Sequence, residues 1–226
     1  MIFKILELCH IGFDERPSKR SLFDYVRHRM DNLPDEAILL DGACQTGWHI
    51  SFLFPNKKNY VGIDIDANCI SECKQKFPSL QFHCCALENL SSCVSNVDVF
   101  VSTNTFCYIS FDNIEKIYQE LQKVLSDNAV ILVSSHFKEN FVENIERFKN
   151  LFSKYFHFVD CMYYRNPLSA PFEDFFSTDG WYGRTTHSRV LQRVGEWLLL
   201  PVEKIFSKSI KLNQGVACYG FFKKNF

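Results

Sequence analysis

The sequence predicts one α/β domain in which a mainly parallel sheet carries helices on both faces. Three observations lead to this prediction. Between residues 37 and 136, short apolar runs of strand length alternate with helical segments, as in consecutive βαβ units. A turn of small residues follows the first apolar run, and a carboxylate ends the second. The 226 residues, 46% of them apolar, suffice for a single core.

Each predicted element has its own signal. Leu22, Val26 and Met30 recur at helical spacing, Pro78 ends one helix, and Ser110 is a capping residue that begins another. The expected strands are 37–40, 60–64, 80–85, 97–104, 130–134, 156–164 and 216–224, and the expected helices are 17–30, 48–54, 67–77, 110–125 and 139–154.

The first strand and the turn after it are the centre of the predicted site. Asp41 follows the apolar run, and Gly42, Ala43 and Gly47 keep the turn tight enough for a ligand to approach the backbone. Asp64 ends the second strand about 20 residues further on, the spacing at which an acid reaches the hydroxyls of a bound ribose. This arrangement predicts a nucleotide-like cofactor at the carboxyl edge of the sheet.

Two details of the turn favour a cofactor without phosphate. A dinucleotide fold needs glycine at the second position of the turn so that the backbone can approach the pyrophosphate, and here that residue is Cys44. Asp41 would repel a pyrophosphate but accept a hydrogen bond from an ammonium group, directly or through water. S-adenosylmethionine has a ribose, an adenine and an amino-acid tail, and it has no phosphate.

From 37 to 136 the chain resembles a class I S-adenosylmethionine-dependent methyltransferase. Residues 41–47 resemble the family's Asp-x-Gly-x-Gly-x-Gly motif, with Ala43 and Gln45 in place of two glycines, and Asp64 falls on the ribose-binding acid. Residues 82–90 are similar to the segment beside the adenine, although Ala86 stands where an Asp often bonds the exocyclic amine. The resemblance implies cofactor contacts from Asp41, Gly42, Ala43, Gly47, Asp64, Ile65, Ala86, Leu87 and Asn104.

The same resemblance implies the remaining architecture. It predicts a Rossmann-like, seven-stranded mixed sheet with six parallel strands and an antiparallel last strand. The whole chain, 1–226, is then one domain: an N-terminal helical cover (1–36), a cofactor-binding core (37–164), a helical insertion on the substrate side (165–213) and the final strand (214–226). The insertion is far longer than a hairpin loop, and we expect it to act as a lid or specificity element.

Composition argues against several classes of protein. The formal net charge of −1 offers no field that would attract nucleic acid, and the end of the fourth strand lacks the Asn/Asp-Pro-Pro-aromatic run of enzymes that methylate base amines. The ten cysteines include no Cys-x-x-Cys and are interpreted as buried small hydrophobes, without disulfides or a metal site.

Nothing resembles a signal peptide or a membrane span, so a cytoplasmic location is expected. Basic residues of the insertion, beside an apolar face, allow peripheral contact with a membrane, although core packing of that face is the alternative.

Catalysis needs few side chains, because a sulfonium methyl group is already activated. His136, after the fifth strand, is the candidate general base, with His10, Tyr108 and His187 as weaker candidates, and a structural role is the alternative for each. His10, Arg20 and Tyr25 are candidates for binding. The predicted function is methyl transfer to a small-molecule, lipid-linked or sugar-linked acceptor. The alternative is an inactive methyltransferase-like partner subunit.

Overall fold

A single sheet organises the computed structural model, which describes residues 25–30, 33–47, 50, 54, 59–137, 140–164, 198, 201, 205 and 217–224. Within these residues the strand order is β3-β2-β1-β4-β5-β7-β6. The strands are β1 (Leu39–Gly42), β2 (Tyr60–Asp64), β3 (Gln81–Cys84), β4 (Val97–Ser102), β5 (Leu125–Ser135), β6 (Phe156–Tyr164) and β7 (Ala217–Lys224). β1 to β5 pair in parallel, whereas β7 lies between β5 and β6 and is antiparallel to both. The predicted Rossmann-like α/β class is confirmed.

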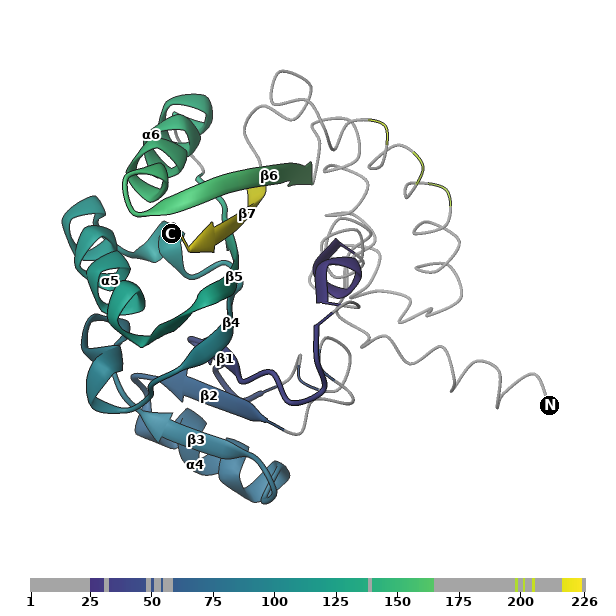
Figure 1. Cartoon of the computed structure of the whole chain (residues 1–226), viewed down its shortest axis with the longest axis vertical. Helices are drawn as coiled ribbons and strands as arrows, with labels where there is room; N and C mark the ends of the chain where they lie inside the picture. The colour runs from purple at the N-terminus through teal and green to yellow at the C-terminus, as the bar shows by residue number, and fades with distance from the viewer. Residues whose placement is uncertain are drawn as a thin grey trace, which may run out of the picture.

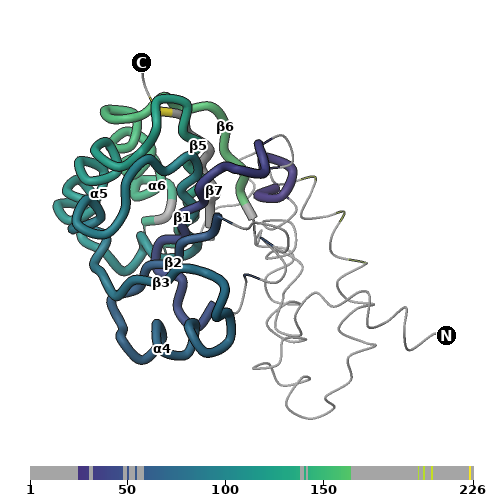
Figure 2. Tube along the Cα trace, turned by 60° about the horizontal axis from the view of Figure 1, so that its bottom comes forward, coloured from purple at the N-terminus to yellow at the C-terminus, as the bar shows by residue number. Residues whose placement is uncertain are grey.

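Helices cover both faces of this sheet. α5 (Phe111–Val124) and α6 (Phe141–Ser153) lie on one side, and residues 25–30, which are helical, lie on the other (Figure 1). Figure 2 shows the same separation from a second direction. The remaining described helices are α4 (Ala67–Lys76) and two short 3₁₀ helices, η1 (Leu87–Ser92) and η2 (Phe106–Tyr108).

Each face has its own core, because successive residues of a strand point to opposite sides of a sheet. Leu40 packs with the buried face of α5, which includes Ile114 and Leu121. Leu39 packs on the opposite face, in a cluster that includes Val26 and Cys73 of α4. The two cores hold the sheet from both sides. Because β1 to β5 are parallel, their carboxyl ends meet at one edge of the sheet.

Most predicted boundaries lie within two residues of the observed ones, and the differences at β1 and β5 follow from strand pairing. β2 and β6 have the predicted bounds, and the side chains of Asp66 and Ser110 cap α4 and α5. β1 runs to Gly42 rather than ending at Leu40, since its parallel pairing with β2 continues to that residue. β5 begins at Leu125, but its register with β4 is interrupted before Val130, where the predicted strand begins.

Several expectations fall outside the described residues. Of the predicted helix 48–54 only positions 50 and 54 are described, and of the insertion 165–213 only 198, 201 and 205. His10, Arg20 and His187 also lie outside them. Among the described residues, no helix combines the length and the apolar character needed to cross a membrane.

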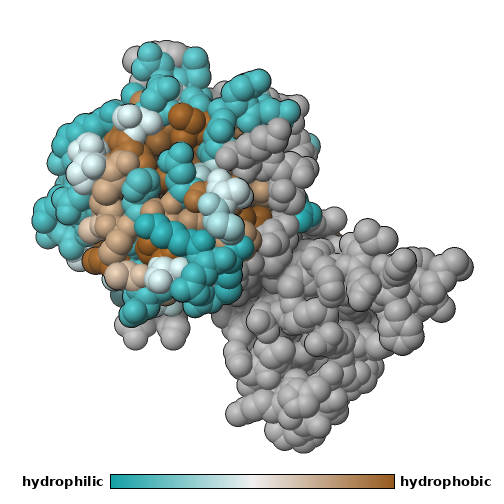
Figure 3. Space-filling view, turned by 90° about the horizontal axis from the view of Figure 1, so that it is seen from below, coloured by the Kyte–Doolittle hydropathy of each residue, from teal (hydrophilic) through white to brown (hydrophobic). Residues whose placement is uncertain are grey.

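The interpretation of the cysteines as uniformly buried was wrong. Of the eight described cysteines, which are all free thiols, Cys44 and Cys73 are buried, but Cys84 is exposed and Cys85 and Cys93 are half-buried. Cys84 ends β3, which is an edge strand of the sheet that the described residues form. Figure 3 views the molecule from the β3 and α4 side and shows apolar residues among hydrophilic ones. The exposure of Cys84 follows from the position of β3 in the strand order, and local sequence patterns do not predict that order.

Candidate functional site

The turn after β1 adopts a backbone conformation that glycine normally provides. Ala43 and Gln45 have φ of 62° and 49°, and Gly47 has φ of 68°. L-residues adopt this left-handed conformation only at a cost, roughly 1–2 kcal/mol per residue. The two residues that replace the motif's glycines therefore keep the glycine-like shape of the turn.

Asp64, the predicted ribose-binding acid, lies against this turn. Its Oδ2 accepts a hydrogen bond from the backbone N–H of Gln45 at 2.9 Å, and its Oδ1 accepts one from the N–H of Asp66 at 2.9 Å. The residue is 9% exposed. The end of β2 and the turn after β1 are thus joined through one carboxylate.

Asp41 lies deeper than Asp64. It is buried at 1% exposure, and the hydroxyl of Tyr60 donates to its Oδ2 at 2.5 Å. Burial, followed by the charge of Asp41, raises the pKa of Tyr60 far above its usual value, so the phenol stays protonated and remains a donor. Tyr60 begins β2, so this bond also ties β2 to β1.

The small size of Gly42 is required by the core. A Cβ at this position would lie 2.7 Å from the ring of Phe100 and 3.1 Å from Leu87 Cδ2. Leu87 is itself buried in the α5 and α6 core at 7% exposure, and its neighbour Ala86 is the N-cap of η1. The side chain of Leu87 is therefore a packing group, and ligand contacts by this segment would come from its backbone.

Ile65 is the most open apolar residue beside the turn. It directly follows Asp64 and is 75% exposed. Burying a large aliphatic side chain is more favourable in free energy than leaving it exposed to water. Ile65 therefore offers an exposed apolar surface next to Asp64.

Three hydrogen bonds connect the ends of β1, β4 and β5. Ser102 Oγ donates to the carbonyl of Gly42 at 2.8 Å. The N–H of Asn104, whose φ is 57°, donates to Ser134 Oγ at 2.8 Å, and that hydroxyl lies 3.2 Å from Asn104 Oδ1. Asn104 is thereby held at the carboxyl edge that β1 shares with β4 and β5.

His136 lies just after β5, beside the loop that follows β4. Its Nδ1 is 3.4 Å from Cys107 Sγ, and the same thiol donates to the carbonyl of Asn104 at 3.2 Å. Tyr108 is 80% exposed, and its ring meets the His136 ring edge-on with centroids 5.8 Å apart. His136, Cys107 and Tyr108 form what we call the histidine cluster.

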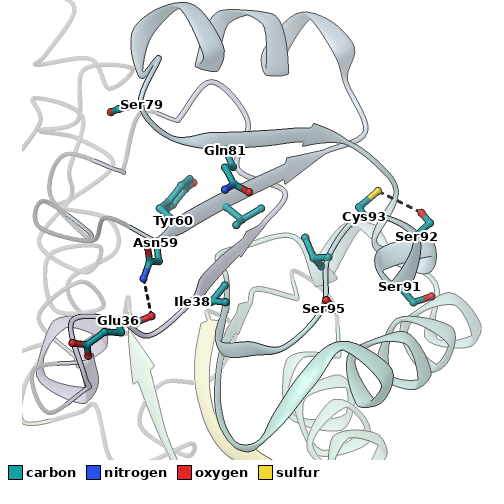
Figure 4. A pocket seen from close by; sticks show the side chains of 12 residues that line it. Glu36, Ile38, Asn59, Tyr60, Ser79, Gln81, Ser91, Ser92, Cys93 and Ser95 are labelled. Atoms are coloured by element: carbon teal, nitrogen blue, oxygen red, sulfur yellow. Dashed lines mark hydrogen bonds between the residues drawn. The ribbon is translucent and has the colours of Figure 1, made fainter.

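A depression of about 650 Å³ lies at the opposite edge of the sheet (Figure 4). Glu36 and Ile38 precede β1, Asn59 precedes β2, and Gln81 begins β3. It lies at the amino ends of the strands, so the predicted cofactor residues at the carboxyl ends are not part of it.

Tyr25, a predicted binding candidate, lies in the helical residues 25–30, where the Arg29 guanidinium stacks on its ring at 5.0 Å. Arg29 in turn forms an ion pair with Asp160 of β6 at 2.5 Å. These contacts give Tyr25 a packing role at the β6 end of the sheet. No group of three or more potential metal ligands occurs within the described part of the chain.

Sequence reasoning missed Tyr60, Cys107 and Ser134. Each binds a predicted site residue through a side-chain contact. A hydroxyl at the start of an otherwise apolar strand was the available signal for Tyr60. The contacts of Cys107 and Ser134 join segments that are distant in the sequence, and no local sequence pattern predicts them.

Comparison with known proteins identifies the fold. Residues 39–128 match the family model described as a methyltransferase domain. No curated protein sequence matches the chain. A TehB-like SAM-dependent methyltransferase from Corynebacterium glutamicum has a similar structure, with 15% identity, a TM-score of 0.61 and coverage of 99% of this chain and 96% of that one.

The N-methyltransferase NodS from Bradyrhizobium japonicum, in complex with S-adenosyl-L-homocysteine, is also similar, at 12% identity and a TM-score of 0.61, with 95% of this chain and 91% of that one covered. At these identities the structures show a shared fold. Residues 39–128 therefore match a methyltransferase domain, and the chain shares the Rossmann-like fold of S-adenosylmethionine-dependent methyltransferases.

Proposed function

We propose that this chain binds S-adenosylmethionine at the carboxyl edge of β1 and β2 and transfers its methyl group to a small-molecule, lipid-linked or sugar-linked acceptor. The observation that carries the proposal is the bond between Asp64 and the backbone of Gln45. It joins the ribose-type acid to a turn that keeps a glycine-like shape without its glycines.

The residues present fit this cofactor. Each oxygen of Asp64 accepts one backbone N–H, and an ionised carboxylate offers about four acceptor sites, so two ribose hydroxyls have acceptors available. Ile65 offers an exposed apolar surface for the adenine, and Ala86 and Leu87 offer backbone groups. Asp41 supplies buried negative charge below the turn, which favours an ammonium group nearby. Gly42, Ala43 and Gly47 shape the backbone, and Asn104 borders the site.

The bound cofactor supplies an activated methyl group, and transfer is an in-line displacement that depends on alignment. The histidine cluster supplies the side chains for the acceptor. We propose that His136 takes the proton from an acceptor that keeps one, since a base must reach that proton by a hydrogen bond or through one water. Exposed Tyr108 would contact the acceptor beside it.

Calorimetric titration with S-adenosylmethionine and S-adenosylhomocysteine tests the cofactor assignment. We expect wild type to bind both, and Asp64→Ala to bind at least 100-fold more weakly, because the ribose loses a charged acceptor. Asp66→Ala is the matched control: Asp66 lies two residues on and caps α4 by accepting from Asn68. Its affinity should stay within threefold of wild type. Wild type that binds neither compound at 1 mM would leave the inactive partner subunit as the better account.

A labelling experiment tests both the class of the acceptor and the role of His136. Wild type and His136→Ala are incubated with methyl-tritiated S-adenosylmethionine and either a water-soluble metabolite fraction or a lipid extract. Label transferred by wild type but not by His136→Ala, while both bind S-adenosylhomocysteine equally, supports the role of His136. Equal labelling by both proteins removes it.

A further inference from the structure

Two buried thiols lie directly beneath the turn after β1. Cys44 belongs to the turn and Cys73 to α4, and both are 0% exposed. Cys73 Sγ donates to the carbonyl oxygen of Gln45 at 3.1 Å, and Cys44 Sγ lies 3.7 Å from the same oxygen. The two thiols also contact each other. One backbone carbonyl is therefore the meeting point of both side chains.

The peptide groups of Gln45 are held on both sides. Its N–H donates to Asp64 at 2.9 Å, and its carbonyl accepts from Cys73 at 3.1 Å. Gln45 is also the residue whose φ of 49° is unfavourable for an L-amino acid. A conformation of this kind persists when surrounding contacts determine it, and these two hydrogen bonds are such contacts.

The chemical state of the thiols suits this role. Burial raises the pKa of both Cys44 and Cys73, so both remain protonated at neutral pH and can donate. Buried thiols of raised pKa are poor nucleophiles, which argues against a redox function for the pair.

We propose that Cys73, supported by Cys44, is a positioning residue for the cofactor: its thiol holds the Gln45 carbonyl and so presents the Gln45 N–H to the ribose-binding carboxylate. It acts through Gln45 and Asp64 and touches no reacting atom. The proposal rests on the proposed function for its effect on affinity, but its effect on the turn needs no cofactor.

Hydrogen exchange of the Gln45 amide, measured by NMR without ligand, tests the clamp directly. In Cys73→Ala we expect this amide to exchange about 3- to 10-fold faster, the range expected for loss of one hydrogen bond. Cys73→Ser keeps a donor at almost the same volume as alanine, so its exchange should stay within twofold of wild type. Cys69→Ala removes a thiol about one turn earlier in α4 and should leave the Gln45 amide unchanged.

Affinity for S-adenosylhomocysteine, measured by calorimetry, should follow the same order. Cys73→Ala should weaken it about 3- to 10-fold and Cys73→Ser less than twofold. In a Gln45→Gly background, Cys73→Ala should cost less than twofold, because glycine adopts positive φ without a restraint.

Unchanged Gln45 exchange in Cys73→Ala, or equal losses in Cys73→Ala and Cys73→Ser, would overturn the clamp. So would an undiminished effect of Cys73→Ala in the Gln45→Gly background. If wild type binds no cofactor, the proposed function fails on its own, and the exchange measurements still decide the clamp.

Discussion

The two halves of the carboxyl edge are built differently. At β1 and β2, Asp64 accepts a hydrogen bond from the Gln45 N–H at 2.9 Å. Tyr60, at the start of β2, donates to Asp41 near the carboxyl end of β1 at 2.5 Å. At β4 and β5, the histidine cluster depends on contacts between two loops, and Tyr108 is 80% exposed. The hydrogen bonds of the first half suit its proposed role in holding the cofactor. The exposed side chain of the second half suits its proposed role in contacting the acceptor.

The largest effect is expected from Tyr60→Phe, which removes the donor to buried Asp41. Loss of a hydrogen bond to a buried carboxylate should lower the free energy of unfolding by about 1–3 kcal/mol. Tyr155→Phe is the matched control, since Tyr155 donates to Glu115 at 2.8 Å in a part-buried position and should cost less. Urea denaturation of the three proteins provides the comparison, and equal losses would show that the first half is no more tightly bonded than the surface.

Glu120→Gln tests the support beneath the adenine segment. Glu120 accepts from the N–H and Oγ of Ser91, which follows the predicted adenine contacts, and pairs with Lys123. The bond with Lys123, followed by those with Ser91, lowers the pKa of Glu120 from 4.5 to about 2. The ionised group therefore stabilises the fold fully above about pH 4.5, and this stabilisation is lost as the pH falls through about 2.

We expect Glu120→Gln to lose about 1–2 kcal/mol at pH 7. Its difference from wild type should shrink steadily between pH 5 and pH 2. Denaturation at several pH values measures this difference, and a gap that stays constant with pH would contradict the assignment.

Ala43→Gly should act in the opposite direction. Glycine removes the strain of a positive φ but adds entropy to the unfolded chain, so we expect a net gain of about 0.5–1 kcal/mol. The midpoint of thermal unfolding should rise accordingly. A loss of stability would mean that the methyl group of Ala43 makes contacts that outweigh its strain.

The smallest effect is expected from Tyr108→Ala in the histidine cluster. An exposed side chain contributes little to stability, so the change should stay within about 0.5 kcal/mol. Affinity for S-adenosylhomocysteine should also be unaltered, because the proposed role of Tyr108 is to contact the acceptor. A large drop in that affinity would erase the distinction between the two halves.

Local sequence was sufficient for the elements and for part of the site. The apolar run at 60–64 predicted β2 with Asp64 at its end, whereas the hydrogen bond of Asp64 to the turn was found in the structure. The sequence did not show that the side chain of Leu87, a predicted cofactor contact, is buried in the same core as Phe100. The Cys73 contact to Gln45 joins residues 28 positions apart, and the exposure of Cys84 follows from the strand order. Such features depend on tertiary packing, which no local periodicity encodes.

The place of β7 has a consequence for how the chain acquires its shape. When β6 leaves the ribosome, the strand that must separate it from β5 has not yet been made, since Ser135 pairs with Cys218, 83 positions later. Pairings of such long range form slowly. Until they form, β5 keeps an open hydrogen-bonding edge, so the nascent protein passes through a stage in which a chaperone or a neighbouring copy can capture that edge.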